Sequence, residues 1–120
     1  MGEAGAGTQL APTSSRVDPE IRRFLTEALV SLRQTVEPQV LVFFGSRVGG
    51  RPDEWSDIDL IVVSPKFEGM RLLARMDWFL EVTQPHIGVD ALCYTPEEFD
   101  YMMAQPSLVR EAVQTGLRVI

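Results

Sequence analysis

Residues 39–64, which read QVLVFFGSRVGGRPDEWSDIDLIVVS, decide the fold. Both ends of this stretch, 39–44 and 57–64, are rich in β-branched and aromatic residues, which is typical of buried strands. The residues between them, 46–56, are polar and include glycine and proline, so we expect a loop with a short helix at its start. The stretch therefore predicts two neighbouring strands, with a sharp break after the first of them at Gly45.

Helical patterns flank these two strands. Upstream, Asp18 is a helix N-cap followed by Pro19, and apolar residues then recur on one helical face until Pro38 ends the helix. Downstream we expect, in order, helix 69–83, strand 87–94, a helix capped by Thr95, a short helix 107–115 and an edge strand 117–120. This order predicts an α/β or α+β fold, in which a small mixed sheet is flanked by helices on one side.

Length and composition limit the architecture. The chain has 120 residues, which suggests one domain. Residues 1–16 are rich in small and polar residues without periodicity, so we expect a disordered tail there and a domain over 17–120. The longest unbroken apolar run, 40–44, is far too short to span a bilayer, and the N-terminus lacks the apolar segment of a secretory signal. A cytoplasmic protein is the default expectation.

Charge and the rare residue types exclude further classes. Seventeen acidic residues against 11 basic ones give a net charge of -6, so the chain has no global field that would attract DNA, and direct DNA binding is not expected. Cys93 and His86 are the single cysteine and the single histidine. A disulfide within the chain and a Cys/His zinc site are therefore ruled out. We expect Cys93 in the core and His86 in a loop or at a strand edge.

Three acidic residues fall within apolar strands. Asp57 and Asp59 are two positions apart, so in a strand their carboxylates point to the same face, and Asp90 lies in the next strand along the chain. Ionised carboxylates in such places are costly unless they are paired or bind a cation, and Mg²⁺ takes oxygen ligands of this kind. The alternative is that Asp57 is a capped turn residue, Asp59 an edge residue and Asp90 a surface residue.

Gly45 and Ser46 stand directly after the first strand, ten residues before the acidic pair. Glycine lets a backbone approach a phosphate, and a serine hydroxyl can bind one, although an ordinary strand-ending turn has the same composition. The spacing of Gly45 and Gly50 is that of a P-loop, but Arg51 and Pro52 stand where that motif needs lysine and a hydroxyl residue. The loop also carries Trp55, which we expect to pack over the sheet rather than stack on a base.

The combination of FGSRVGG with SDIDLIVV resembles the signature of the DNA polymerase β-type nucleotidyltransferase superfamily, and in particular its minimal nucleotidyltransferase subfamily. The resemblance extends over about residues 20–120 and implies the polymerase β-like nucleotidyltransferase fold. It implies that Gly45 and Ser46 hold the nucleoside triphosphate and that Asp57 and Asp59 bind two Mg²⁺ ions. The third acid of the family's site is matched by Asp90.

The activity implied by the resemblance is nucleotidyl transfer, in which an acceptor hydroxyl attacks the α-phosphate of ATP or another nucleoside triphosphate. Asp57, Asp59 and Asp90 are then the catalytic and metal-binding residues, and Gly45, Ser46 and Arg47 are the nucleotide-binding residues. The resemblance also implies a partner, because proteins of this subfamily act as antitoxins that transfer AMP to a small helical HEPN ribonuclease toxin. A homo-oligomer is equally compatible with the sequence.

One departure from the family pattern leaves alternatives open. Where the family often has a second arginine, this chain has Gly49, and Arg51 is the nearby basic residue that could substitute for it. The chain could instead be a non-catalytic antitoxin that neutralises its partner by binding it, since an acidic surface suits a basic partner. A nucleotidyltransferase that acts on a small molecule is a further alternative.

Overall fold

The computed structural model describes residues 17–120, and the predicted tail 1–16 lies outside the described residues. The elements are α1 (Pro19–Ser31), the π-helix η2 (Leu32–Val36), β1 (Val40–Phe44), α2 (Ser46–Gly49), β2 (Ile58–Val63), the 3₁₀ turn η3 (Pro65–Phe67), α3 (Leu72–Thr83), β3 (Val89–Tyr94), α4 (Pro96–Met103), α5 (Leu108–Thr115) and β4 (Leu117–Arg118). None of the helices in this part of the chain has both the length and the apolar character that a membrane crossing requires.

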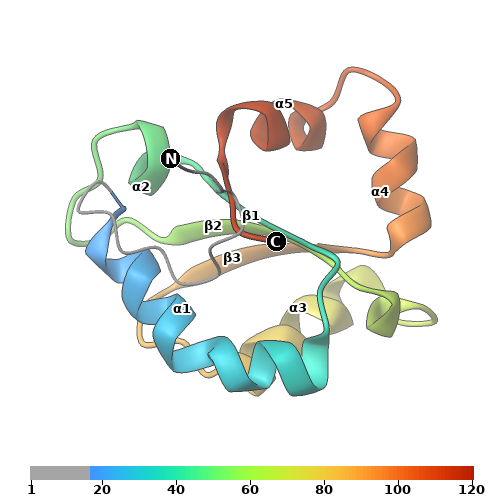
Figure 1. Ribbon diagram of the computed structural model, residues 1–120, viewed down its shortest axis with the longest axis horizontal. Helices are drawn as coiled ribbons and strands as arrows, with labels where there is room; N and C mark the ends of the chain where they lie inside the picture. Colours follow the sequence, from blue (N-terminus) through green and yellow to red (C-terminus); the bar gives the residue numbers. More distant parts are fainter. Residues whose placement is uncertain (1–16) are drawn as a thin grey trace, which may run out of the picture.

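The four strands form one mixed sheet in the order β3-β2-β1-β4, as Figure 1 shows. β1 runs antiparallel to both β2 and β4, whereas β2 and β3 are parallel and are joined by the crossover through α3. The predicted mixed sheet flanked by helices is therefore confirmed. β3 forms one edge of the sheet and the short β4 forms the other.

Helices cover both faces of the sheet, so the expectation that they lie on one side is wrong. α1 and α3 pack on one face, while α4 and α5 pack on the other (Figure 1). The reason is the continuous apolar composition of β1 and β2, in which successive side chains point to opposite faces and nearly all are buried. Val42 and Ile61 belong to the cluster under α4 and α5, whereas Leu41 and Leu60 belong to the larger cluster under α1 and α3.

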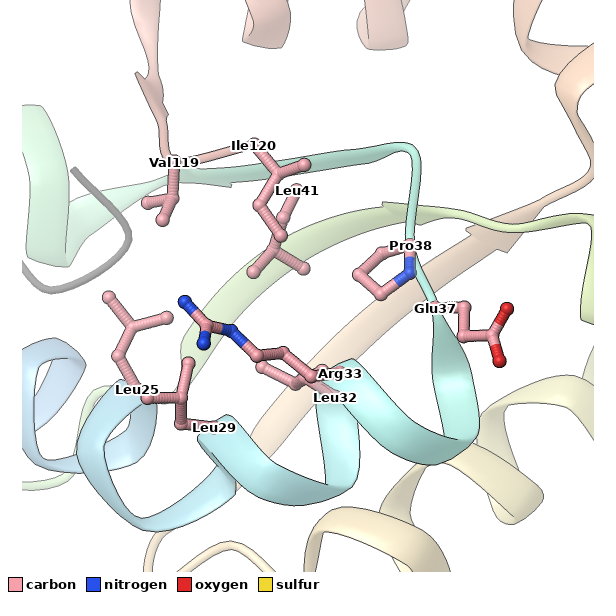
Figure 2. A pocket seen from close by; sticks show the side chains of 9 residues that line it. All are labelled: Leu25, Leu29, Leu32, Arg33, Glu37, Pro38, Leu41, Val119 and Ile120. Carbon is pink, nitrogen blue, oxygen red and sulfur yellow. The ribbon is translucent and has the colours of Figure 1, made fainter. Parts of the chain in front are cut away.

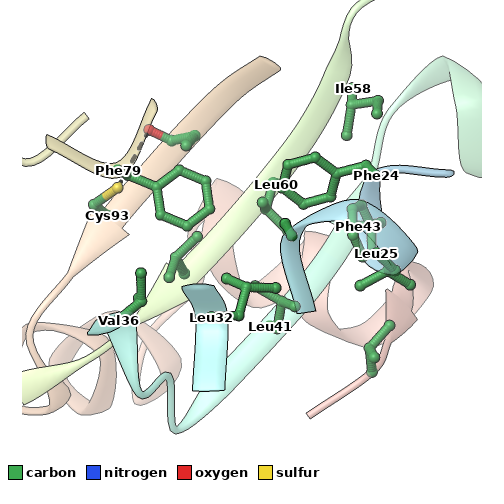
Figure 3. Close-up of a cluster of buried hydrophobic side chains, with 14 of the residues drawn as sticks. Phe24, Leu25, Leu32, Val36, Leu41, Phe43, Ile58, Leu60, Phe79 and Cys93 are labelled. Atoms are coloured by element: carbon green, nitrogen blue, oxygen red, sulfur yellow. Dashed lines mark hydrogen bonds between the residues drawn. The ribbon is translucent and has the colours of Figure 1, made fainter. Parts of the chain in front are cut away.

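Aromatic side chains fill the larger cluster, which Figure 3 shows in close-up. The ring of Phe24 on α1 meets the ring of Phe43 on β1 edge to face at 6.1 Å and lies 6.4 Å from the ring of Phe79 on α3. All three side chains are buried, as is Cys93 on β3, in agreement with the expectation for this cysteine. This contact between α1, β1 and α3 fixes the helical layer against the sheet.

The first helix begins as predicted but ends differently. The Asp18 side chain accepts hydrogen bonds from the backbone N–H groups of Glu20 and Ile21, so it is the N-cap. The last turn is a π-helix rather than an α-helix. There the Ser64 hydroxyl donates a 2.6 Å hydrogen bond to the carbonyl of Val36. This buried carbonyl at the helix end has no partner within the helix, so a residue that follows β2 supplies one. Sequence periodicity does not reveal such a partner.

A buried arginine joins three elements on the β3 side of the sheet. Arg75 on α3 is 6% exposed and donates to both carboxylate oxygens of Glu98 at 2.6 and 3.1 Å. It also donates to the carbonyls of Met70 and Cys93 at 2.9 and 3.2 Å. Glu98 in turn closes the predicted capping box with Thr95 at the start of α4. α3, β3 and α4 are therefore tied together by one charged group.

The Glu98–Arg75 contact predicts a pH-dependent stability. The hydrogen bond from Arg75 holds the pKa of Glu98 below its ordinary value of 4.5, so the ionised carboxylate stabilises the folded state. This contribution is present above the ordinary pKa and is lost as the pH falls through the lowered pKa. We expect Glu98→Gln to lower the free energy of unfolding at pH 7, and the gap from wild type to shrink near pH 3. Urea unfolding at both pH values measures it.

The matched control is Glu97→Gln, because Glu97 is exposed in the same helical turn. It should change stability little at either pH. An equal loss for the two variants at pH 7, or a gap for Glu98→Gln that stays constant with pH, contradicts the assigned role of the contact.

Candidate active site

Two of the predicted acidic residues lie side by side on neighbouring strands. The parallel register of β2 and β3 places Asp59 directly beside Asp90. Adjacent strands are about 4.8 Å apart, and directly paired residues point to the same face. That face is the one covered further along by α4 and α5, because Ile61 and Tyr94 of the same strands pack there. Two like charges in this position repel each other.

The third predicted acid, Asp57, lies one residue before β2 rather than inside it. Its carboxylate rests against Gly88, at the point where the next strand begins, and a methyl group at Gly88 would collide with Oδ1 of Asp57. The backbone N–H of Ile58 donates to the carbonyl of Gly88 at 2.9 Å, which fixes this approach. Gly88 was not among the predicted site residues, and no local pattern in the sequence identifies it.

The three carboxylates influence one another electrostatically. The pKa of Asp59 is raised above its ordinary value of 3.8, chiefly because burial disfavours its charge, and then because Asp90 and Asp57 repel it. Within residues 17–120, no three Asp, Glu, His or Cys side chains form a ready-made metal-binding group. The donor set nevertheless fits a divalent cation, since carboxylate oxygens are the ligands of Mg²⁺ and a cation would relieve this repulsion. Asp57, Asp59 and Asp90 are the residues that would hold it.

The glycine–serine pair lies against the same acids. Gly45 has a φ of 83°, and a Cβ there would collide with the carboxylate of Asp59, so both its conformation and its surroundings require glycine. Ser46 begins α2, and its hydroxyl makes no hydrogen bond to any other residue of the described part. A cavity of about 140 Å³ opens beside Gly45, between α2 and the end of α5. The structure thus brings together the predicted cradle and the predicted acids.

Arg47 has a different set of contacts from the one that the family pattern suggests. Its side chain is 6% exposed, and Nη1 donates to both carboxylate oxygens of Asp18, at 3.2 and 3.0 Å. Nε donates to the carbonyl of Ser56 at 2.8 Å, and Nη2 donates to the carbonyl of Asp53 at 3.1 Å. The guanidinium therefore holds the loop before Asp57 against the start of α1. Its predicted contact with a triphosphate stays a prediction.

Three further residues considered in the sequence lie in the loops around these strands. His86 lies in the loop before β3, as expected, and its Nε2 forms a short hydrogen bond with the carboxylate of Glu20 on α1. Trp55 is 82% exposed, so the expectation that it packs over the sheet is wrong. The Trp55 backbone N–H is bound by the Asp53 carboxylate in a tight turn, which directs the chain outward at this point. Arg51 is also exposed.

An apolar hollow of about 320 Å³ lies elsewhere, between α1, η2, β1 and the residues after β4, as Figure 2 shows. Its lining is mainly leucine, valine, isoleucine and proline side chains, together with Arg33 and Glu37. It includes none of the three acids and neither residue of the glycine–serine pair. The polar end of the sheet, rather than this hollow, is therefore the candidate active site.

Of the three solved structures compared below, the first has a fold that agrees with this one. A candidate nucleotidyltransferase from Sulfolobus solfataricus is similar, with a TM-score of 0.53 and 22% sequence identity over 75% of this chain and 82% of that chain. Two proteins from Arabidopsis thaliana align at a TM-score of 0.48. BolA1 is 21% identical over 71% of this chain and 96% of its own, and the BolA domain of SufE1 is 22% identical over 72% and 99%. No curated protein sequence matches this chain significantly.

The family assignment comes from the sequence itself. The model of the nucleotidyltransferase domain family matches residues 25–117, which include both strands of the opening stretch, the glycine–serine pair and all three acids. The match extends over most of the chain, and this protein therefore belongs to the nucleotidyltransferase domain family.

Proposed function

We propose that this protein is a Mg²⁺-dependent nucleotidyltransferase that moves AMP from ATP to a hydroxyl group of a protein partner. The observation that carries the proposal is the in-register pair of Asp59 and Asp90. Asp59 lies against Gly45, and the charges of Asp90 and Asp57 both act on it. Nucleotidyltransferase domains in general act on nucleoside triphosphates with divalent metals. The choice of ATP as the nucleotide, of Mg²⁺ as the metal and of a protein as the acceptor goes beyond what the family assignment gives and is proposed here.

The nucleotide would lie between the glycine–serine pair and the acids. Gly45 offers a backbone without a side chain, and the Ser46 hydroxyl can donate to a phosphate oxygen. Asp57, Asp59 and Asp90 would hold two Mg²⁺ ions. When bound, the ions would neutralise the triphosphate and polarise its α-phosphorus. In the protein alone the pKa of Asp59 is raised first by burial and then by the charges of Asp90 and Asp57, and bound cations would offset both effects.

The reaction is a single displacement at phosphorus. The acceptor oxygen forms a bond to the α-phosphorus, the bond from that phosphorus to the bridging oxygen of the β-phosphate breaks, and pyrophosphate leaves with the electron pair. Asp90, at the edge strand of the sheet, takes the proton of the acceptor hydroxyl on its carboxylate. Asp57 and Asp59 would hold the ions that orient the triphosphate.

The resemblance to minimal nucleotidyltransferases supports a small helical HEPN-type toxin as the acceptor, with this chain as its cytoplasmic antitoxin. A second candidate function is neutralisation of that partner by binding alone. Two observations favour it: the second arginine of the family pattern is replaced by Gly49, and Arg47 is occupied by Asp18, Ser56 and Asp53. An acceptor among small molecules is a further outcome of the same test.

Transfer of a labelled nucleotide tests the proposal directly. ATP labelled at the α-phosphate is supplied with Mg²⁺ to the protein mixed with lysate of its source cells. We expect label on one small protein, and loss of that label with the Asp57→Asn/Asp59→Asn variant, because the carboxylates that hold the ions are gone. The loss should exceed about a hundredfold, the scale of removing a main electrostatic contribution.

The control is Asp77→Asn, a change of the same type on α3 outside the three acids, which should leave the transfer unchanged. Label on RNA or on a small molecule would support nucleotidyl transfer but would show that the acceptor is not a protein. No transfer from any nucleoside triphosphate, with partner binding intact, leaves the binding function instead.

The proposal also predicts that the site costs stability. Because the pKa of Asp59 is raised in the folded protein, its charge opposes folding at neutral pH, and this penalty fades as the pH falls through the raised pKa. We expect Asp59→Asn to increase the free energy of unfolding at pH 7 by up to about 1 kcal/mol, the scale of like charges on adjacent strands. Urea unfolding in the absence of metal measures this difference in the free energy of unfolding. A variant that is less stable than the wild type contradicts a repulsion between Asp59 and its acidic neighbours.

Arg47 yields a test that separates positioning from phosphate binding. If Arg47 acts by holding the loop before Asp57, Arg47→Ala and Asp18→Ala should both weaken Mn²⁺ binding, and the double variant should be no worse than either one. Each should also lower the free energy of unfolding by about 3 kcal/mol, since a buried ion pair is broken. Calorimetric titration with Mn²⁺ measures the affinity. A weaker ATP affinity for Arg47→Ala alone would instead indicate a phosphate contact.

A further inference from the structure

His86 is a largely enclosed polar residue that the proposed reaction does not use. It lies in the loop between α3 and β3, and its side chain is 11% exposed. Its Nε2 lies 2.5 Å from Oε1 of Glu20 on α1. An ionised carboxylate only accepts hydrogen bonds, so Nε2 carries a proton and donates it. One charge-assisted hydrogen bond therefore joins this loop to the first turn of α1.

The other ring nitrogen of His86 faces a second carboxylate of the same helix. Nδ1 lies 3.7 Å from Oε1 of Glu27, which is too far for a hydrogen bond, and this buried nitrogen has no hydrogen-bond partner within residues 17–120. Glu27 also accepts from Nε of Arg23 at 2.9 Å. Glu20 and Glu27 are seven positions apart, so they lie on one side of α1, two turns from each other. The imidazole is therefore held against one side of this helix.

The loop that His86 fixes carries Gly88, which rests against Asp57. A Cβ at Gly88 would collide with the Asp57 carboxylate, so the two residues are in close approach. Ile87, between His86 and Gly88, packs against the larger apolar cluster. Two residues span at most about 7 Å of chain, so the place of the imidazole limits where Gly88 can lie.

The chain just before Asp57 is held by the same turn of α1. Arg47 donates to the carbonyl of the residue before Asp57 and to the carboxylate of Asp18, the N-cap of α1. Glu20, which accepts from His86, lies two residues after this cap. Asp57 is therefore approached by two segments, and each of them is bound by a side chain at the start of α1.

We propose that His86 is a positioning residue of the active site, because its hydrogen bond to Glu20 fixes the loop in which Gly88 holds the Asp57 carboxylate in place for metal binding. The inference rests on the proposed nucleotidyl transfer, which assigns Asp57 to a metal ion. His86 acts through Gly88 rather than by touching the metal or the nucleotide. The start of α1 is then the common support of both segments around Asp57.

Amide hydrogen exchange tests the hold of His86 on the loop in the full chain without metal. The N–H of Ile58 donates to the carbonyl of Gly88 at 2.9 Å, so its exchange rate reports on this contact. We expect His86→Ala to speed exchange at Ile58 about tenfold, the scale of losing one hydrogen bond to a charged group. The N–H of Gln39, which donates to the carbonyl of Val63 at the far end of the sheet, should keep its rate.

Two further variants test whether the hydrogen bond to Glu20 is responsible. His86→Gln retains an amide nitrogen that can donate to Glu20, so exchange at Ile58 should stay close to that of the wild type. Glu20→Ala should speed exchange as much as His86→Ala does. The double variant should be no faster than either single one, because both changes remove the same contact.

The consequence for the site is measured by calorimetric titration with Mn²⁺. His86→Ala should weaken Mn²⁺ binding by about tenfold, the lower end of the range for residues that support a metal ligand, and His86→Gln should restore it. The matched control is Ser64→Ala, which removes a buried hydrogen bond to Val36 beyond the other end of β2. It should lower the free energy of unfolding and leave the Mn²⁺ affinity unchanged.

The outcomes separate the two proposals. Unchanged exchange at Ile58 in His86→Ala, or equally fast exchange in His86→Gln, overturns the positioning role even where Mn²⁺ binds normally. An equal loss of Mn²⁺ affinity in Ser64→Ala also overturns it, since any loss of stability would then have the same effect. If the wild type binds no Mn²⁺, the metal site of the proposed function fails, whereas faster exchange at Ile58 in His86→Ala still supports the hold of His86 on the loop.

Discussion

The repulsion between Asp59 and Asp90 is the constraint on which the arrangement of this protein depends. Two carboxylates occupy paired positions of the parallel strands β2 and β3, whose other residues are aliphatic, cysteine or tyrosine. The surrounding sequence accommodates them by leaving out side chains, since Gly45 stands against one acid and Gly88 against Asp57. The clustered negative charges lower the stability of the folded state. The apolar layers on both faces of β1 and β2 compensate for that loss.

Two buried arginines hold the segments around this site. Arg47 joins the loop before Asp57 to the N-cap of α1, and Arg75 joins α3, β3 and α4 on the β3 side of the sheet. Each satisfies backbone carbonyls as well as one carboxylate, so each replaces several of the regular hydrogen bonds that loops lack.

Local chemistry made most of the fold predictable. The strands, the Asp18 cap and the Thr95 capping box depend on residues close in sequence, and all are observed. The second helical layer was missed because element order does not reveal which face a helix takes. Contacts between distant residues were also missed, since Arg47 and Asp18 are 29 positions apart and Ser64 and Val36 are 28 apart. The candidate acids could therefore be predicted from the sequence. The close approach of Gly88 to Asp57 and the hydrogen bonds by which Arg47 holds the loop before Asp57 became visible only in the structure.

The pairing of β1 with β4 has a consequence for the order of folding during synthesis. Val42 pairs with Arg118, so the inner strand β1 keeps one unpaired edge until the ribosome has released almost all of the described chain. β1 and β2 are close in sequence and can pair early, whereas the last strand closes a long loop. A nascent chain of this protein therefore exposes an apolar strand edge from the synthesis of β1 until that of β4, and such a surface is prone to aggregation.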